Sequence, residues 1–194
     1  VWIFVTNNII WSEPDMERAA SNQITVLTEN EVNYYDSYIR HMGPAGRYQV
    51  LAELLHGQRI PELEGTKVPA VKGRVGGFTY FSFVTTPRTL LKISYVNHLA
   101  LNHPDGRPAY QRMVTKNRLK SIAKFIDDGG YFPTNLLVNF TQKCRFDPIS
   151  NKGSAAVGKY GWLYLPNRFK SAWVIDGQHR LYGYSFSDSA HWDD

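Results

Sequence analysis

Short runs of β-branched and aromatic residues alternate along the chain with segments of helical periodicity, and this alternation restricts the fold more than any other feature. Residues 1–6 (VWIFVT) alternate apolar side chains with a period of two, which predicts a buried strand. Residues 116–127 place apolar side chains at i, i+3, i+4 and i+7 from Leu119, which predicts an amphipathic helix with a basic outer face. Because strand and helix patterns alternate throughout, we predict a mixed α/β (α+β) fold.

The pattern predicts two parts that meet near residue 65. Residues 1–65 are expected to run strand, helix, strand, helix, helix, with a capping box at Thr28 and Glu31 before the second helix. The composition of residues 57–73 shifts to Gly, Pro and charge, which places the boundary between the two parts near residue 65. Further strands are expected at 78–84, 135–140, 161–165 and 173–176.

Composition excludes several classes of protein. The longest apolar runs fall short of the ~18–20 residues that span a bilayer, so we expect no contact with a membrane. The single cysteine, Cys144, excludes an internal disulfide and a multi-thiolate metal cluster, fits a cytoplasmic location and is expected to pack in a core. The net charge of +5 permits contact with nucleic acid or nucleotides, although the charges are dispersed. An oligomer is compatible with the sequence.

The strongest candidate site is VIDGQHRLYGY, residues 174–184, where a strand runs directly into polar residues. A glycine between a strand and a helix lets the backbone approach a phosphate, and the first N–H groups of the helix point toward it. Arg180 can add a bidentate contact to phosphate oxygens, while Asp176 can hold a divalent metal, orient His179 or position a water. Alternatively, Asp176 caps the helix and Arg180 pairs with a surface acid.

A basic helix and the loop that follows it supply further candidates. Arg112, Lys116 and Arg118 lie near the start of helix 116–127, and one or two of them can reach the same phosphates. Alternatively, they form a solvated helical face. Asn135 lies where the loop enters the next strand, and it can orient a ligand or cap its own backbone.

These motifs resemble those of the DGQHR-domain family, which is related to the ParB/sulfiredoxin fold. The signature is residues 176–180, DGQHR. The upstream stretch 110–140, YQRMVTKNRLKSIAKFIDDGGYFPTNLLVNF, resembles the sequence that precedes the signature in that family. It also resembles the ParB pattern of an arginine-bearing helix, a glycine turn, a proline and a strand. The resemblance covers residues 66–194 and implies a ParB/sulfiredoxin-like domain there, cut short at its C-terminus.

The resemblance implies that the turn binds phosphate. ParB-like proteins grip nucleotide phosphates with a glycine–acid–arginine–arginine turn, and sulfiredoxin binds ATP with a glycine–cysteine–histidine–arginine turn. Gly177, His179 and Arg180 match the second turn, whereas Gln178 replaces the cysteine and so excludes sulfinic-acid reduction. Arg118 matches the ParB-type arginine upstream.

The implied function is binding of ATP or CTP with Mg²⁺, followed by hydrolysis, in a DNA-modification or phage-defence system. The expected phosphate ligands are Gly177, Gln178, Arg180, Arg118, Arg112 and Asn135. Asp176 would hold the metal or align water, and His179 would assist proton transfer. A non-catalytic regulator that binds double-stranded DNA is the alternative, and it would bind duplex in a strongly salt-dependent way.

The N-terminal stretch NNIIWSEPDMERAASNQITVLTENEVNYY resembles the last strands and helices of restriction-endonuclease-like domains. This likeness implies that residues 1–65 are the C-terminal part of an α/β, nuclease-like module. The acid–lysine active site of such a module would lie upstream of residue 1. The chain as part of a nuclease is therefore the second alternative.

Overall fold

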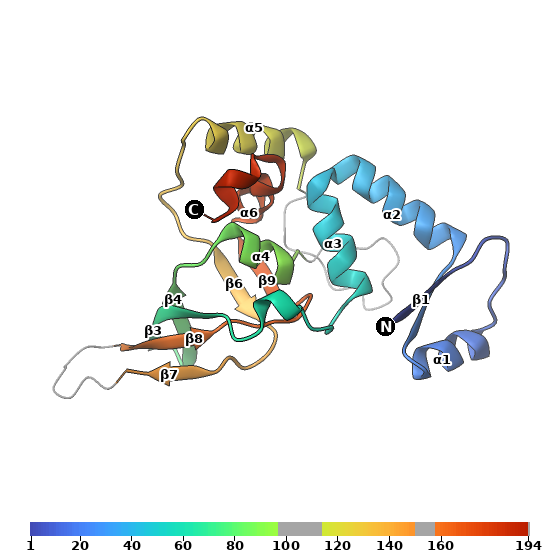
Figure 1. The fold of residues 1–194 in the computed structure, drawn as a ribbon, viewed down its shortest axis with the longest axis horizontal. Helices are drawn as coiled ribbons and strands as arrows, with labels where there is room; N and C mark the ends of the chain where they lie inside the picture. Colours follow the sequence, from blue (N-terminus) through green and yellow to red (C-terminus); the bar gives the residue numbers. More distant parts are fainter. Residues whose placement is uncertain (97–113, 150–157, 194) are drawn as a thin grey trace.

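The computed structural model of the protein describes residues 1–96, 114–149 and 158–193, which form a mixed α/β fold (Figure 1). The helices, strands and short 3₁₀ helices are, in chain order, β1 (Trp2–Val5), α1 (Glu13–Ser21), β2 (Ile24–Leu27), α2 (Glu29–Met42), α3 (Pro44–Leu54), η1 (Pro61–Leu63), β3 (Lys67–Val75), β4 (Phe78–Phe83), α4 (Pro87–Ile93), β5 (Ser94–Tyr95), α5 (Lys116–Asp127), β6 (Leu137–Phe140), β7 (Phe146–Pro148), β8 (Lys159–Tyr164), β9 (Ala172–Asp176), α6 (Gln178–Gly183), η2 (Tyr184–Phe186) and η3 (Ser189–Asp193).

The predicted mixed fold is confirmed, and local capping chemistry explains where several helices begin. The predicted helix at 116–127 is α5, with the same bounds. The predicted capping box is present at the start of α2, where the backbone N–H of Thr28 donates to Glu31 Oε2 over 2.8 Å. The ParB/sulfiredoxin likeness and the nuclease-like origin of the N-terminal part stay predictions.

The described strands form three small sheets. β1 and β2 pair in parallel, and a four-stranded antiparallel sheet has the order β4-β3-β8-β7. The third sheet has the order β5-β9-β6, in which β9 is parallel to β5 and antiparallel to β6. No strand was predicted within residues 57–73, but β3 begins at Lys67 and pairs on both edges.

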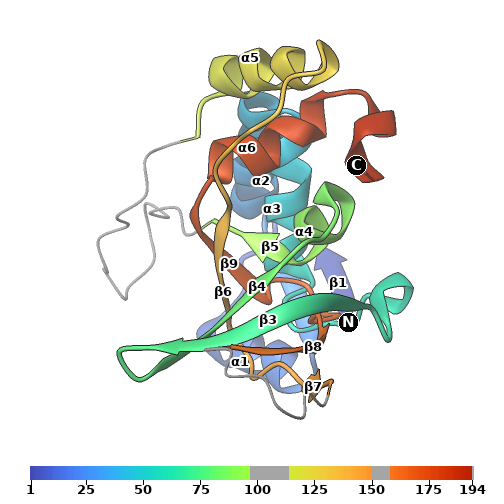
Figure 2. The same cartoon turned by 90° about the vertical axis from the view of Figure 1, so that its left-hand side faces the viewer.

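The main core gathers around β9. Helices α3, α4, α5 and α6 lie on the same side of the molecule as β5 and β9, and the four-stranded sheet lies beyond them (Figures 1 and 2). Leu91, Leu119, Val174 and Leu181 come from α4, α5, β9 and α6, and all are buried. Burial of each such side chain stabilises the folded state by about 1.5–3 kcal/mol. Packing against this core therefore fixes the positions of β9 and α6. Within the described ranges, no helix is long and apolar enough to cross a bilayer.

The N-terminal elements differ from the sequence prediction in their burial. β1 forms as predicted, but its four residues are exposed rather than buried, because β2 is its one partner strand among the described residues. In α3, Leu51 is exposed and Gln49 is buried. Gln49 hydrogen-bonds to Tyr182 in α6, so α3 packs with the C-terminal elements. The division of the chain at residue 65 stays a prediction.

Candidate functional site

The candidate site is the DGQHR turn, residues 176–180, which joins the central strand of a sheet to a short helix. β9 ends at Asp176, Gly177 follows, and α6 begins at Gln178. Gly177 has φ = 88°, a left-handed conformation that favours glycine. A Cβ at this position would lie 2.2 Å from Leu136 Cδ2, so the turn has no room for a side chain here.

Arg180 connects the turn to the loop before β6. Its Nη1 donates to both the carbonyl and the hydroxyl oxygen of Thr134, and its Nη2 lies 3.0 Å from Asp176 Oδ2. The side chain of Arg180 is 17% exposed, whereas that of Asp176 is 72% exposed. The guanidinium is therefore a fixed, mostly buried positive charge at the start of α6, and the carboxylate beside it faces solvent.

The position of Thr134 follows from strand register. Leu137 of β6 pairs with Asp176 of β9, so the residues just before β6 lie beside the start of α6. Thr134 was not predicted as a site residue, because this contact depends on antiparallel pairing of segments about 40 residues apart. Asn135, which was predicted, is the next residue and is exposed.

The other predicted residues lie at different distances from this centre. Gln178 is buried and His179 is partly buried, both in the first turn of α6. Arg118 lies on the exposed side of α5, whose Ile122 packs against Gly183 at the other end of α6. Arg112 lies outside the described residues. The structure thus brings together Asp176 and Arg180, with Gly177 between them, but shows no contact between Arg118 and the turn.

The donor chemistry of the turn fits a hard cation held through one carboxylate. In the described part of the chain, no group of three or more His, Cys, Asp or Glu side chains could enclose a metal ion. Mg²⁺ does not need such a cage, because it keeps several waters and takes further oxygens from phosphates. Asp176, with an exposed carboxylate beside a buried arginine, fits that kind of site.

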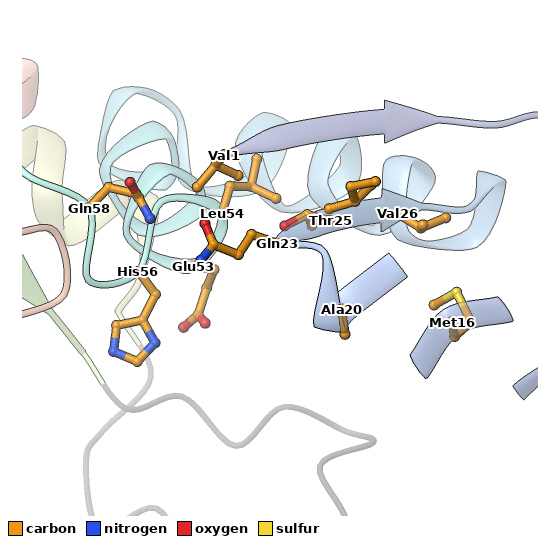
Figure 3. Close-up of a pocket in the computed structure, with 11 residues that line it drawn as sticks. Val1, Met16, Ala20, Gln23, Thr25, Val26, Glu53, Leu54, His56 and Gln58 are labelled. Atoms are coloured by element: carbon orange, nitrogen blue, oxygen red, sulfur yellow. The ribbon is translucent and has the colours of Figure 1, made fainter. Parts of the chain in front are cut away.

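A separate cavity of about 470 Å³ lies between α1, β2 and the end of α3 (Figure 3). Glu53 and His56 point to the same side of it, and no described residue of the DGQHR turn lines it. Glu53 is already bound by Lys170, at 2.5 Å from Nζ to Oε2. We therefore place the candidate site at the turn.

Comparison with known proteins associates the chain with DNA modification. A family model described as DNA-sulfur modification-associated, DndB, matches residues 68–185, which run from β3 to η2 and include the whole DGQHR turn. Because this match covers more than half of the chain, the chain belongs to the DndB family. No curated protein and no solved structure matches it. The expected DNA-modification context is therefore confirmed at the level of the family.

Proposed function

We propose that the DGQHR turn binds the phosphates of a nucleoside triphosphate with Mg²⁺, ATP first and CTP second, as part of DNA sulfur modification. The observation that carries this proposal is a left-handed glycine between a central strand and a helix, with a mostly buried arginine on one side and an exposed carboxylate on the other. Strand ends of this kind are where α/β proteins commonly bind phosphorylated ligands.

Each residue of the turn has a distinct part in this proposal. Gly177 allows close approach of the backbone, and the first N–H groups of α6 would face phosphate oxygens. A guanidinium has five N–H donors, and the hydrogen bonds of Arg180 to Thr134 and Asp176 fix it in place while leaving donors for a ligand. Because the arginine is already ordered, little side-chain entropy would be lost on binding.

Asp176 and His179 are the proposed catalytic residues. When bound, Mg²⁺ would neutralise phosphate charge, and Asp176 would hold it. In hydrolysis, water would attack the terminal phosphorus and the bond to the bridging oxygen would break, giving nucleoside diphosphate and phosphate. His179 would accept the proton of that water. Arg118, Arg112 and Asn135 are proposed as additional phosphate contacts.

Calorimetric titration with ATP and CTP, each with Mg²⁺, tests the binding site. We expect wild-type binding and about 10- to 100-fold weaker binding by Arg180→Ala, since charge-assisted hydrogen bonds are lost. Asp176→Asn should weaken binding with Mg²⁺ but not without it. Lys120→Ala, which removes an exposed charge from α5, is the control.

The stability of each variant must accompany these titrations, because Arg180 also holds the loop at Thr134. Arg180→Lys keeps the charge but cannot contact Thr134 and Asp176 at the same time through two nitrogens. It should therefore fold and bind with intermediate affinity. Absence of binding by the wild type to either nucleotide would overturn the proposal.

The second candidate function is a non-catalytic regulator that binds duplex DNA. The three hydrogen bonds of Arg180 within the protein favour it, because they also suit a purely structural turn. This function predicts affinity for duplex that falls steeply with salt and does not change with nucleotide. Arg180→Ala would then lower thermal stability while nucleotide has no effect on the wild type. A nuclease with its active site upstream of residue 1 stays a hypothesis.

A further inference from the structure

The two faces of the four-stranded sheet differ in chemistry. On one face, every second side chain of the strands packs in the second apolar core, as Ala70, Leu163 and Phe81 do. The opposite face carries five aromatic residues, which we call the aromatic face: Phe78 and Tyr80 on β4 and Tyr160, Trp162 and Tyr164 on β8. Successive side chains on one face of a strand are two residues apart, so the three rings of β8 form a row.

The rings of the aromatic face are accessible and lie along the sheet. Tyr80 is 48% exposed and Tyr160 is 44% exposed. Tyr80 is paired across the strands with Gly73, where a Cβ would lie 2.3 Å from Tyr80 Cζ. The ring therefore lies over the backbone of β3 and turns its other side to solvent. A flat, exposed ring in this position offers a surface for stacking.

Basic side chains surround these rings. Lys67 Nζ lies 5.0 Å from the centre of the Trp162 ring, and Arg145 Cζ lies 4.5 Å from the centre of the Tyr164 ring. Arg74, near the turn between β3 and β4, is exposed but has the same alternation as Ala70, so it lies on the opposite face of the sheet. Figure 2 shows that this hairpin extends away from the helices.

One acid, Asp147, occurs in the described strands of this sheet, and its charge is balanced locally. Arg145 Nη2 lies 2.6 Å from Asp147 Oδ2, and Tyr164 also hydrogen-bonds to the carboxylate. These bonds, of which the one from Arg145 contributes most, hold the pKa of Asp147 below its ordinary value. With Lys67 and Arg145 against Asp147, the aromatic face carries a small net positive charge.

We infer that the aromatic face binds single-stranded nucleic acid, with bases stacked on Tyr80, Tyr160 and Trp162 and phosphates bound by the surrounding Lys and Arg side chains. Aromatic rings within a positively charged surface are the combination that unpaired strands require. In a duplex the base faces are covered by their neighbours, so duplex can use the charges but not the rings. When bases stack on the rings, the Lys67 and Arg145 side chains that now lie over Trp162 and Tyr164 would bind phosphates instead.

This inference is independent of nucleotide binding at the DGQHR turn, because the two surfaces share no residue. Its test is fluorescence anisotropy with a labelled oligothymidylate of about 12 nucleotides and with a duplex of the same length, without nucleotide. We expect the full chain to bind the single strand more tightly than the duplex. Affinity should fall as salt is raised.

Single substitutions separate stacking from charge. Tyr80→Ala and Tyr160→Ala should each weaken binding of the single strand about tenfold and leave duplex binding unchanged. Lys67→Gln should weaken both and reduce the salt dependence. The control is Tyr131→Ala, which removes a tyrosine that is even more exposed, in the loop after α5, and it should have no effect. Thermal melting of each variant checks that it folds.

Two results would overturn the inference. One is absence of binding to the single strand by the wild type at low salt. The other is binding that Tyr80→Ala and Tyr160→Ala leave unchanged in variants that melt like the wild type, since another surface must then be responsible.

Discussion

Gly177 is the residue on which the geometry of the turn depends most directly. Gly177→Ala forces a side chain into the left-handed region and against Leu136, so we expect a loss of about 2–4 kcal/mol in the free energy of unfolding. Urea denaturation measures this loss. Gly76 also has a positive φ, 53°, but nothing lies near its missing Cβ. Gly76→Ala should therefore cost only about 1 kcal/mol, and an equal loss in the two variants would contradict this account.

Cys144 packs against the second core, and its burial has a measurable consequence. Burial raises the pKa of the Cys144 thiol to about 11. We therefore expect alkylation by iodoacetamide at pH 8 to be about 100-fold slower in the folded chain than in urea, because the thiolate reacts. The folded pKa lies above the unfolded one of about 8.5, so this group's contribution to stability falls as pH rises from there toward 11. Equal alkylation rates would contradict burial of the thiol.

At the scale of elements, Gln49 links three parts of the chain. Its Oε1 accepts from the backbone N–H of Val96 over 3.0 Å, and its Nε2 donates to the Tyr182 hydroxyl. Gln49→Leu leaves both buried groups unsatisfied, so we expect a loss of about 3 kcal/mol in unfolding free energy. Tyr182→Phe removes the hydroxyl alone and should cost about 1 kcal/mol.

Chemical denaturation of these two variants and of the double variant gives the coupling between the side chains. Non-additive losses are expected, since the same hydrogen bond is removed twice. Strictly additive losses would mean that α3 and α6 are not coupled through this contact.

The elements that could be predicted are those whose ends are encoded locally. The cap at Thr28, the proline at position 87 and the apolar spacing of α5 lie within a few residues of the structure they determine. β3 was not predicted, because Pro69 and Gly73 disfavour a strand locally, and it is the pairing with β4 and β8 that makes these residues a strand. The link from Arg180 to Thr134 was missed for the same reason, because it depends on the pairing of β6 with β9. The DGQHR turn itself was visible, since its residues are consecutive.

At the scale of the whole molecule, stability is distributed unevenly. β1 and β2 form a parallel pair, an arrangement that is normally buried on both faces, and a two-stranded sheet is marginally stable. Every residue of β1 is exposed, with Trp2 at 73%. The alternating pattern of residues 1–6 indicates a strand but contains no information about what covers it, which is why burial was predicted wrongly. The core around β9, by contrast, is closed by residues of α2, α3, α4, α5 and α6.

Hydrogen exchange should reveal this difference directly. Amides of β1 and β2 are expected to exchange through local opening, whereas those of β9 should exchange only on global unfolding. Leu91→Ala, at a buried position in α4, should lower the melting temperature and weaken the protection of β9, because it leaves a cavity costing about 2–5 kcal/mol. Trp2→Ser should leave both unchanged, since an exposed side chain contributes little to the core. Equal protection of β1 and β9 would show that the N-terminal strands unfold with the rest of the molecule, and that the exposure of β1 does not weaken it.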